Sequence, residues 1–247
     1  MIIIPMAGQS RRFYEAGYSR PKYELALAGE SLFACCTRSF EHYFPSERFV
    51  FVCREGWEAR AFVTAECERL GVADYRIVCL DEATRGQAES VLLGLEAAGC
   101  GGNESLLIFN IDTIRPHYVF PAIADSADGY LEVFSGEGEH WSFVQPSAAF
   151  GSRVARTTEK ERISSLCCTG LYHFARADDF SAACAEALRD LEAYRARWGE
   201  LYIAPLYNML IADGKRVVYH ETGRGEVHFA GTPAEYDALL ALQPVLF

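Results

Sequence analysis

The sequence predicts an α/β protein of three layers, in which helices cover both faces of a mainly parallel central sheet and a smaller lobe extends that sheet. Through the first half of the chain, strand-like apolar runs alternate with helix-period segments, a pattern typical of this architecture. After about residue 115 the runs become shorter and Gly-rich turns separate them. We therefore expect one domain over 1–247, with a first half at 1–115 and a second lobe at 116–247 that share a continuous sheet.

Four apolar runs predict the strands of the first half, at 2–6, 49–53, 76–80 and 106–111. Between the last two runs, a helix is predicted over 86–98 because its apolar residues share one face, at Ala88, Val91, Leu92 and Leu95. In a sheet of this kind, ligands bind at the carboxyl ends of the strands.

Shorter strands are predicted in the second half, at 130–134, 142–146, 169–174 and 216–221. One helix is expected over 179–198, where a continuous apolar stripe runs from Phe180 to Tyr194. A last helix is expected to begin at a capping box formed by Thr232 and Glu235, with Pro233 at its first position.

The chain is acidic, with 23 Lys and Arg against 34 Asp and Glu and a net charge of -11. This balance argues against a nucleic-acid partner, because such binding needs clustered cations. Any phosphate ligand must then be held locally, by a few placed cations and backbone N–H groups. No apolar stretch is long enough to span a membrane and the N-terminus does not resemble a signal peptide, so we expect a cytoplasmic protein.

Two residue types are informative by their number and spacing. The nine cysteines include no C-x-x-C pair, so we expect reduced, mostly buried thiols. Lysine occurs only at Lys22, Lys160 and Lys215, in a chain that otherwise uses arginine. Such retained lysines are candidates for a role that a guanidinium does not fill.

The first candidate site follows the first strand, in a loop that holds Gly8, Gln9 and Ser10, with Arg12 and Lys22 after it. A short loop that leaves a strand can aim successive N–H groups at an anion, and the two cations would neutralise that anion. An ordinary turn with solvated arginines is the alternative, because one glycine is a weaker signal than a full phosphate-binding loop.

Two further candidates contain carboxylates. Asp112 directly follows the apolar run at 106–111. A hard oxygen ligand at that place suits Mg²⁺ beside nucleotide phosphates, and an aspartate that caps a turn is the alternative. Glu159 and Lys160 form either a surface charge pair or a site that uses one of the rare lysines.

Together these segments resemble the nucleotidyltransferase family that makes NDP-sugars from nucleoside triphosphates and sugar 1-phosphates. The resemblance covers nearly the whole chain in order, through IIIPMAGQSRRF, SRPKYEL, TRGQAESVLLGL, FNIDT, TEKERISSLCCTGLYHF, ELYIAPLYNMLIADGK and GTPAEY. It is greatest to short members associated with capsule and lipopolysaccharide biosynthesis. The resemblance implies a Rossmann-like fold of the nucleotide-diphospho-sugar transferase type, a Mg²⁺-dependent reaction and a role in making surface polysaccharide.

The resemblance also implies which residues bind the nucleotide. The loop after the first strand would cradle the triphosphate with Ala7, Gly8, Gln9 and Ser10. Arg12 would contact the outgoing pyrophosphate, and Lys22 would bridge the α-phosphate and the attacking phosphate. Gly86 and Gln87 would lie at the base.

The remaining implied roles concern the metal and the acceptor. Asp112 would hold Mg²⁺, Glu159 would bind a sugar hydroxyl and Lys160 would bind the sugar phosphate. The attacking phosphate is already an anion, so in-line displacement needs alignment and cations but no general base.

Two positions depart from the family pattern. Ser10 stands where the family usually has its second loop glycine, which puts the close approach of the backbone to the phosphates in question. Phe229 stands where many relatives have a second metal aspartate, so either Glu226 or His228 replaces that ligand or the site relies on Asp112 alone.

One position bears on the choice of base. Asp81 lies five residues before Gly86, where some relatives read a pyrimidine with glutamine. A carboxylate only accepts hydrogen bonds, so it would favour the amino group of cytosine and hence CTP. A solvent-facing loop aspartate is the alternative.

Two other function classes stay open. A nucleotide-binding regulatory protein that has lost turnover would account for Ser10 and Phe229. A glycosyltransferase of similar architecture would use an activated sugar, but it usually carries a D-x-D metal motif where this chain has Asn110-Ile111-Asp112. Because family members often self-associate, a homo-oligomer is a further expectation.

Overall fold

Four parallel strands form the centre of the fold in the computed structural model, which describes residues 1–54, 58–149 and 151–242. These strands are β1 (Ile2–Pro5), β4 (Arg48–Arg54), β5 (Asp74–Leu80) and β6 (Leu106–Phe109). β1 lies between β6 and β4, and β5 pairs with the other edge of β4. The four strands coincide with the four predicted apolar runs, which confirms the parallel half of the sheet.

The second half of the chain extends this sheet mainly with antiparallel strands. β11 (Leu166–Phe174) is buried along its whole length and pairs with β6. β8 (Gly129–Ser135) and β9 (Ser142–Pro146) both pair with β11, and β10 (Val154–Glu159) pairs with β9. β12 (Val217–Glu221) runs parallel to β8.

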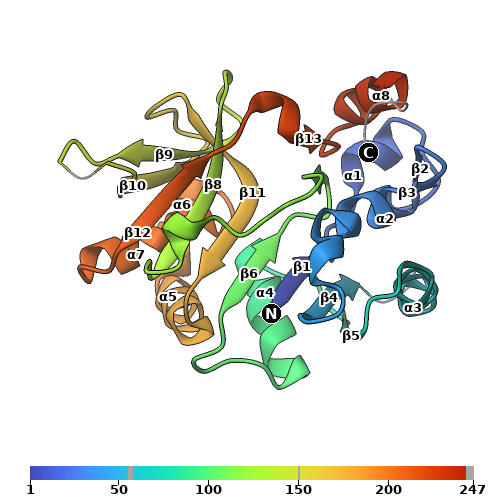
Figure 1. Ribbon diagram of the computed structural model, residues 1–247, viewed down its shortest axis with the longest axis horizontal. Coiled ribbons are helices and arrows are strands. Elements are labelled where there is room, and N and C mark those ends of the chain that lie inside the picture. The colour runs from blue at the N-terminus through green and yellow to red at the C-terminus, as the bar shows by residue number, and fades with distance from the viewer. Residues whose placement is uncertain (55–57, 150, 243–247) are drawn as a thin grey trace.

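All of these strands belong to one nine-stranded sheet, in the order β10, β9, β11, β6, β1, β4, β5, with β8 paired to β11 and β12 paired to β8. Figure 1 shows the sheet crossing the molecule, with the strands of the second half at one end and β4 and β5 at the other. The two halves of the chain are therefore joined by the hydrogen bonds between β6 and β11, as predicted.

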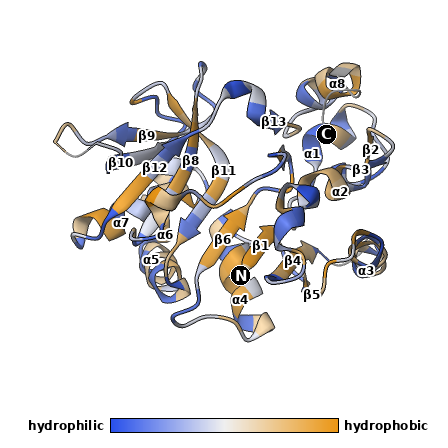
Figure 2. Cartoon of the chain, viewed as in Figure 1, coloured by the Kyte–Doolittle hydropathy of each residue, from blue (hydrophilic) through white to orange (hydrophobic). Residues whose placement is uncertain are grey.

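Helices cover both faces of the sheet, which confirms the three-layer prediction. On one face, α4 (Gln87–Ala98), α5 (Ala177–Arg189) and α7 (Tyr207–Ala212) share a core with Ile3 and Val50. On the other face, α2 (Leu32–Thr37) and α3 (Ala59–Leu70) pack with Ile2 and Phe51. Successive residues of the central strands enter opposite cores, so β1 and β6 are apolar throughout and β4 is apolar between its terminal arginines (Figure 2).

Short elements connect the layers. The 3-10 helices are η1 (Lys22–Glu24), η2 (Arg38–Tyr43), η3 (Ala122–Ala124), η4 (Ala204–Leu206) and η5 (Arg224–Glu226). β2 (Ala26–Leu27) pairs with β3 (Glu30–Ser31), and β7 (Thr113–Ile114) pairs with β13 (His228–Phe229). The second pair brings a late segment of the chain beside the segment that follows β6.

The last helix, α8 (Pro233–Leu242), packs against α1 (Arg11–Glu15), where the C-terminal part of the chain meets the N-terminal part in Figure 1. The capping box is confirmed: the N–H of Thr232 donates to the Glu235 carboxylate at 2.9 Å, and the N–H of Glu235 donates to Thr232 Oγ1 at 3.3 Å. The Tyr236 hydroxyl donates to the carbonyl oxygen of Ala26 at 2.6 Å. α8 thus contacts both α1 and β2, the elements that flank the segment with Lys22.

Two predicted elements differ from the structure. The helix expected over 179–198 is two helices, α5 and α6 (Leu191–Trp198), because Asp190 leaves the helical conformation with φ -125° and ψ 55°. Its side chain accepts a hydrogen bond from the N–H of Ala193 at 3.4 Å and so caps α6. The strand expected over 106–111 ends at Phe109, since the N–H of Thr113 turns back to the carbonyl oxygen of Asn110 at 3.1 Å.

The cysteines follow the sequence prediction. All nine lie in the described part of the chain and are free thiols, and most are buried. Among the described residues, no helix combines the length and apolar character that crossing a membrane requires.

Candidate functional site

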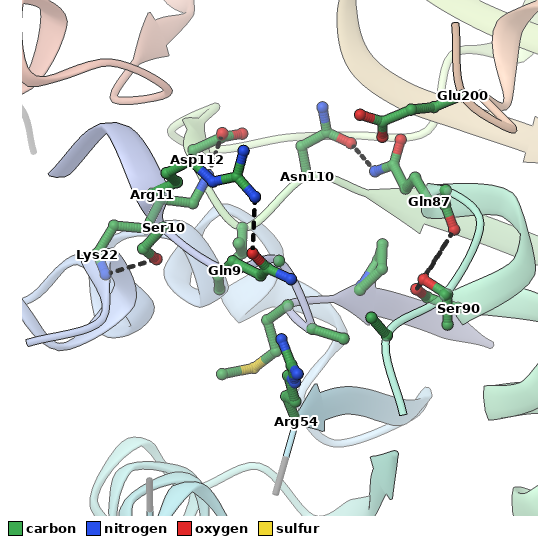
Figure 3. A pocket seen from close by; sticks show the side chains of 18 of the residues that line it. Gln9, Ser10, Arg11, Lys22, Arg54, Gln87, Ser90, Asn110, Asp112 and Glu200 are labelled. Atoms are coloured by element: carbon green, nitrogen blue, oxygen red, sulfur yellow. Dashed lines mark hydrogen bonds and ion pairs between the residues drawn. The ribbon is translucent and has the colours of Figure 1, made fainter. Parts of the chain in front are cut away.

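Two cavities adjoin at the carboxyl ends of the parallel strands, where the sequence predicts ligand binding. The first has a volume of about 640 Å³ and the second about 260 Å³. Both are lined by Arg12, Gln87, Asn110, Asp112 and Gly231, so these residues stand at their junction. The first cavity receives residues from the ends of β1 and β4, from α1 and from the loop before α4 (Figure 3).

The predicted phosphate-binding loop lies in the first cavity. Its lining includes all four predicted loop residues, Ala7, Gly8, Gln9 and Ser10. Ser10 has φ 49° and ψ 26°, the left-handed conformation that glycine adopts without steric cost. Serine therefore adopts a glycine-like conformation at the position where the resemblance leads us to expect glycine, and its hydroxyl accepts a hydrogen bond from the N–H of Lys22 at 3.1 Å.

Lys22 and Asp112 form an ion pair, although 90 positions separate them in the sequence. Lys22 Nζ lies 2.5 Å from Asp112 Oδ2. Their side chains are 18% and 23% exposed, so both charges are partly shielded but open to the cavity. The structure thus brings together the predicted catalytic lysine and the predicted metal ligand at the junction of the two cavities.

The donor set at Asp112 can be tested against the predicted Mg²⁺. Within the described ranges, no group of three or more His, Cys, Asp and Glu side chains is arranged to hold a metal ion. Mg²⁺ often needs only one or two carboxylates, because substrate phosphates and water complete its shell. Asp112 already attracts the ammonium of Lys22, so its carboxylate is placed to hold a cation at the junction of the two cavities. The residues present therefore fit a metal held between Asp112 and substrate.

The second metal ligand predicted as an alternative is not supported by the geometry. Glu226 and His228 line neither cavity. The Glu226 carboxylate accepts hydrogen bonds from the Thr222 hydroxyl and from the N–H of Gly223 and lies 3.4 Å from Arg115, and these contacts, that of Thr222 above all, lower its pKa. Phe229 is buried beside Trp141, with 4.8 Å between ring centroids. Neither of the two predicted substitutes therefore lines the cavities that Asp112 lines.

The loop before α4 closes the first cavity on the side predicted to meet the base. Gly86 has φ 155°, and a Cβ placed on it would lie 2.4 Å from the main-chain nitrogen of Leu201. The Gln87 amide donates to Asn110 Oδ1 at 2.5 Å, and Figure 3 shows Glu200 on the same side of the cavity. Both predicted residues therefore line the cavity, whereas the exposed Asp81 does not.

A second contact holds this loop in place. Glu89 in the first turn of α4 is buried, and its carboxylate accepts a hydrogen bond from Arg85 Nε at 2.7 Å and another from Arg85 Nη2. These bonds to Arg85 lower the pKa of Glu89 against the effect of burial. The charge-assisted contact ties the loop to the helix.

The predicted acceptor residues line the second cavity at the end of β10. Glu159 is buried, which raises its pKa, and its carboxylate accepts a hydrogen bond from the Ser142 hydroxyl. Lys160 Nζ donates to the Tyr202 hydroxyl at 2.6 Å. Partial burial lowers the pKa of Lys160, but the hydrogen bond to Tyr202 and nearby carboxylates raise it above its usual value.

Several lining residues were not identified from the sequence, namely Arg54, Asn110, Ser142, Arg195, Glu200 and Tyr202. Arg54 and Asn110 stand at or just after the carboxyl ends of β4 and β6, so their position along a predicted strand was an available signal. Glu200 and Tyr202 lie on a segment that reaches the site only through tertiary packing.

The sequence matches the family model described as the MobA-like NTP transferase domain over residues 2–197. A search of curated proteins finds no significant match. Among solved structures, the nucleoside-diphosphate-sugar pyrophosphorylase from Vibrio cholerae RC9 is 47% identical with a TM-score of 0.90, and the match covers 98% of this chain and 100% of that one.

Two more distant structures share the fold. The inositol-1-phosphate CTP transferase from T. maritima is 18% identical with a TM-score of 0.74, and the match covers 99% of this chain and 96% of that one. The UTP-bound UGPase from Acinetobacter baumannii is 13% identical with a TM-score of 0.69, over 98% of this chain and 92% of that one.

Proposed function

Since the chain belongs to the family of MobA-like NTP transferase domains and is a nucleotidyltransferase of the NDP-sugar pyrophosphorylase type, we propose that it transfers an NMP unit from a nucleoside triphosphate to a sugar 1-phosphate or a similar small phosphorylated precursor. The observation that carries this proposal is the ion pair of Lys22 and Asp112 at the junction of two cavities. A reaction between two phosphates needs a cation and a metal ligand at the point where the two substrates meet.

In the proposed reaction, an oxygen of the acceptor phosphate attacks the α-phosphorus. A new P–O bond forms, the bond from the α-phosphorus to the oxygen that bridges to the β-phosphate breaks, and pyrophosphate leaves. Lys22 neutralises charge on the α-phosphate and the attacking phosphate, and Arg12 neutralises charge on the pyrophosphate. Because the attacking group is already an anion, the residues align and stabilise rather than remove a proton.

The proposal divides the substrates between the two cavities. The larger cavity holds the nucleotide, with Gly8 and its neighbours at the phosphates and Gly86 and Gln87 at the base. The smaller cavity holds the acceptor, with Lys160 at its phosphate and Glu159 at a hydroxyl. Mg²⁺ bound at Asp112 would supply Lewis-acid neutralisation of the triphosphate. We accordingly propose that 1–115 is chiefly the nucleotide-binding half and 116–247 chiefly the acceptor-binding lobe, with Arg195, Glu200 and Gly231 of the lobe also lining the first cavity.

The donor base is left to measurement, because Asp81 does not line the cavity and so gives the predicted preference for CTP no geometric support. A place in surface-polysaccharide synthesis, which the resemblance implies, and a cytoplasmic location, which the sequence pattern predicts, are both part of the proposal. Self-association stays a prediction that light scattering on the purified protein would check.

A thermal shift experiment tests the proposal without knowledge of the acceptor. The purified protein is heated with ATP, CTP, GTP, UTP or dTTP, each with and without Mg²⁺. A nucleotide at about a hundred times its Kd should add roughly 2.7 kcal/mol and raise Tm by several degrees, more so with Mg²⁺. The nucleotide identified is then incubated with a panel of sugar 1-phosphates while pyrophosphate release is measured.

The outcomes separate the open function classes. Pyrophosphate release that depends on a sugar 1-phosphate supports the proposal. A nucleotide-dependent shift with no turnover on any acceptor would favour the regulatory protein. No shift with any of the five nucleotides would contradict the proposal, and activated sugars would then be tested as glycosyltransferase donors.

A further inference from the structure

Residues 200–202 bridge the two cavities. Glu200 lines the first cavity, Tyr202 lines the second, and Leu201 between them is fully buried. The main chain of Leu201 pairs with the loop before α4, since its N–H donates to the carbonyl oxygen of Arg85 at 3.1 Å and its carbonyl oxygen accepts from Ala88 at 2.9 Å. Two main-chain hydrogen bonds thus fix this segment against the loop at the base end of the nucleotide cavity.

Glycine at position 86 makes this contact possible. A Cβ on Gly86 would lie 2.4 Å from the nitrogen and 2.6 Å from the carbonyl oxygen of Leu201. Any side chain would push the two segments apart, and the φ of 155° is one that only glycine adopts readily. Glycine at position 86 is therefore required for the loop before α4 and residues 200–202 to keep this main-chain contact.

Tyr202 carries this contact to the second cavity. Lys160 Nζ donates to its hydroxyl oxygen at 2.6 Å and lies 4.7 Å from the centroid of its ring. One of the three N–H groups of the ammonium is held by the phenol, so two remain for a phosphate. Tyr194 on α6 supports the same segment from behind, since its hydroxyl donates to the carbonyl oxygen of Tyr202 at 2.8 Å.

We infer that Tyr202 is a positioning residue for Lys160. We also infer that residues 200–202 couple nucleotide binding in the first cavity to the orientation of Lys160, and hence to acceptor binding, in the second. This inference rests on the proposed function, because it assigns a regulation of that same site. A nucleotide that packs on Gly86 and Gln87 shifts the loop before α4, the main chain of Leu201 moves with the loop through its two hydrogen bonds, and Tyr202 then turns Lys160 toward the acceptor. Because such linkage is reciprocal, each substrate should tighten the other by the same factor, typically about fivefold or more.

The scarcity of lysine makes this inference testable without turnover. In protein labelled with ¹³C-lysine, the chain has three lysines, Lys22, Lys160 and Lys215, whose signals can be assigned with the variants Lys160→Arg and Lys215→Arg. The probes are ATP, CTP, GTP, UTP and dTTP, each with Mg²⁺. The readouts are the ¹³Cε chemical shift of each lysine and its dependence on pH.

In the wild-type protein, the nucleotide that binds should shift the signals of both Lys22 and Lys160. In Tyr202→Phe the shift of Lys22 remains and the shift of Lys160 is lost. The pKa of Lys160 also falls in this variant, because the phenol oxygen no longer accepts its hydrogen bond. Tyr194→Phe is the matched control: it removes a hydroxyl from the same segment but leaves the contact between Tyr202 and Lys160, so the shift of Lys160 should persist.

Three results would overturn the inference. A Lys160 shift that persists in Tyr202→Phe would mean that the nucleotide acts on Lys160 directly through its charge. Equal losses in Tyr202→Phe and Tyr194→Phe would mean that loosening of the segment is the whole effect. A wild-type protein in which Lys22 responds but Lys160 does not would refute the linkage while leaving the proposed function intact. If Lys22 responds to none of the nucleotides, the proposed function fails as well.

Discussion

Lys22 is the residue whose removal should affect the proposed reaction most. Lys22→Ala should reduce pyrophosphate release by about a hundredfold or more, since a positioned cation acts on charge that develops in the transition state. The free energy of unfolding should change by less than about 1 kcal/mol, because the pair with Asp112 is partly exposed. Steady-state kinetics and urea unfolding measure the two effects.

Lys215 offers a matched control for this substitution. It also pairs with a carboxylate, that of Asp179 on α5, but it lines neither cavity. Lys215→Ala should keep turnover close to that of the wild type. Near-normal turnover in Lys22→Ala would remove Lys22 from the proposed mechanism.

Ser10 allows the cost of its backbone conformation to be separated from the value of its hydroxyl. Ser10→Gly and Ser10→Ala both lose the hydrogen bond from Lys22, but alanine keeps the strained left-handed φ of 49° while glycine relieves it. We expect Ser10→Ala to be less stable than Ser10→Gly by about 1 kcal/mol in chemical unfolding. Equal stabilities would show that the turn is not strained.

The site residues differ in how far the sequence could predict them. Gly8, Lys22, Asp112 and Lys160 belong to contiguous segments with a recognisable order, and the structure places them on the two cavities. Tyr202 could not be found in this way, because its role depends on a contact with Lys160 that is set by packing. The left-handed turn at Ser10 was also out of reach, since serine rarely adopts it and the surrounding structure determines it.

At the scale of elements, a cluster of charges ties β3, η2 and α3 together. Glu30 accepts hydrogen bonds from Arg38 at 2.8 and 2.9 Å and from Arg69 at 2.8 Å. The hydrogen bond from Arg38, with help from Arg69, lowers the pKa of Glu30 to about 2. The three elements are therefore held by a carboxylate that, in the folded protein, stays ionised at pH values well below those at which glutamate is usually protonated.

This cluster predicts a loss of stability in acid. The folded-state pKa of Glu30 lies below the ordinary glutamate value of 4.5, so the unfolded chain takes up a proton first as the pH falls. The contribution of Glu30 is complete above about pH 4.5 and is lost progressively toward pH 2. Urea unfolding across this range should show a shallower decline for Glu30→Gln than for the wild type. Parallel declines would contradict the assignment.

Elements with a strong apolar period were predictable, and those defined by single contacts were not. Three of the four central strands, β1, β4 and β6, carry buried apolar residues on both faces, so the sequence places them to within a few residues. The break at Asp190 interrupts a stripe that looks continuous, because the capping bond of one side chain decides it. The pair β7 and β13 is too short to leave any period in the sequence.

At the scale of the whole molecule, the overall charge does not describe the site. The chain carries a net charge of -11, yet the lining of the first cavity includes Arg11, Arg12, Lys22, Arg54, Arg85 and Arg195. The prediction that a phosphate ligand must be held by locally placed cations fits this lining. Composition argued against a nucleic-acid partner but could not locate these cations.

The continuous sheet predicts that the molecule unfolds as one unit. β11 lies at its centre and pairs with β6 from the first half and with β8 and β9 from the second half. Melting followed by far-UV circular dichroism and by hydrogen exchange of β1 and β8 amides should give one coincident transition. Separate transitions for the two strands would show that the halves are independent folding units.

With the base placed beside Gly86 as proposed, the close approach of Gly86 to Leu201 also limits how the donor preference of this enzyme can be redesigned. Gly86 has no room for a Cβ, so most substitutions at this position would displace the loop before α4. Its neighbours Ala83, Thr84 and Gln87 line the cavity without that restriction. A search for variants that accept another base should therefore randomise these three positions and leave the glycine unchanged.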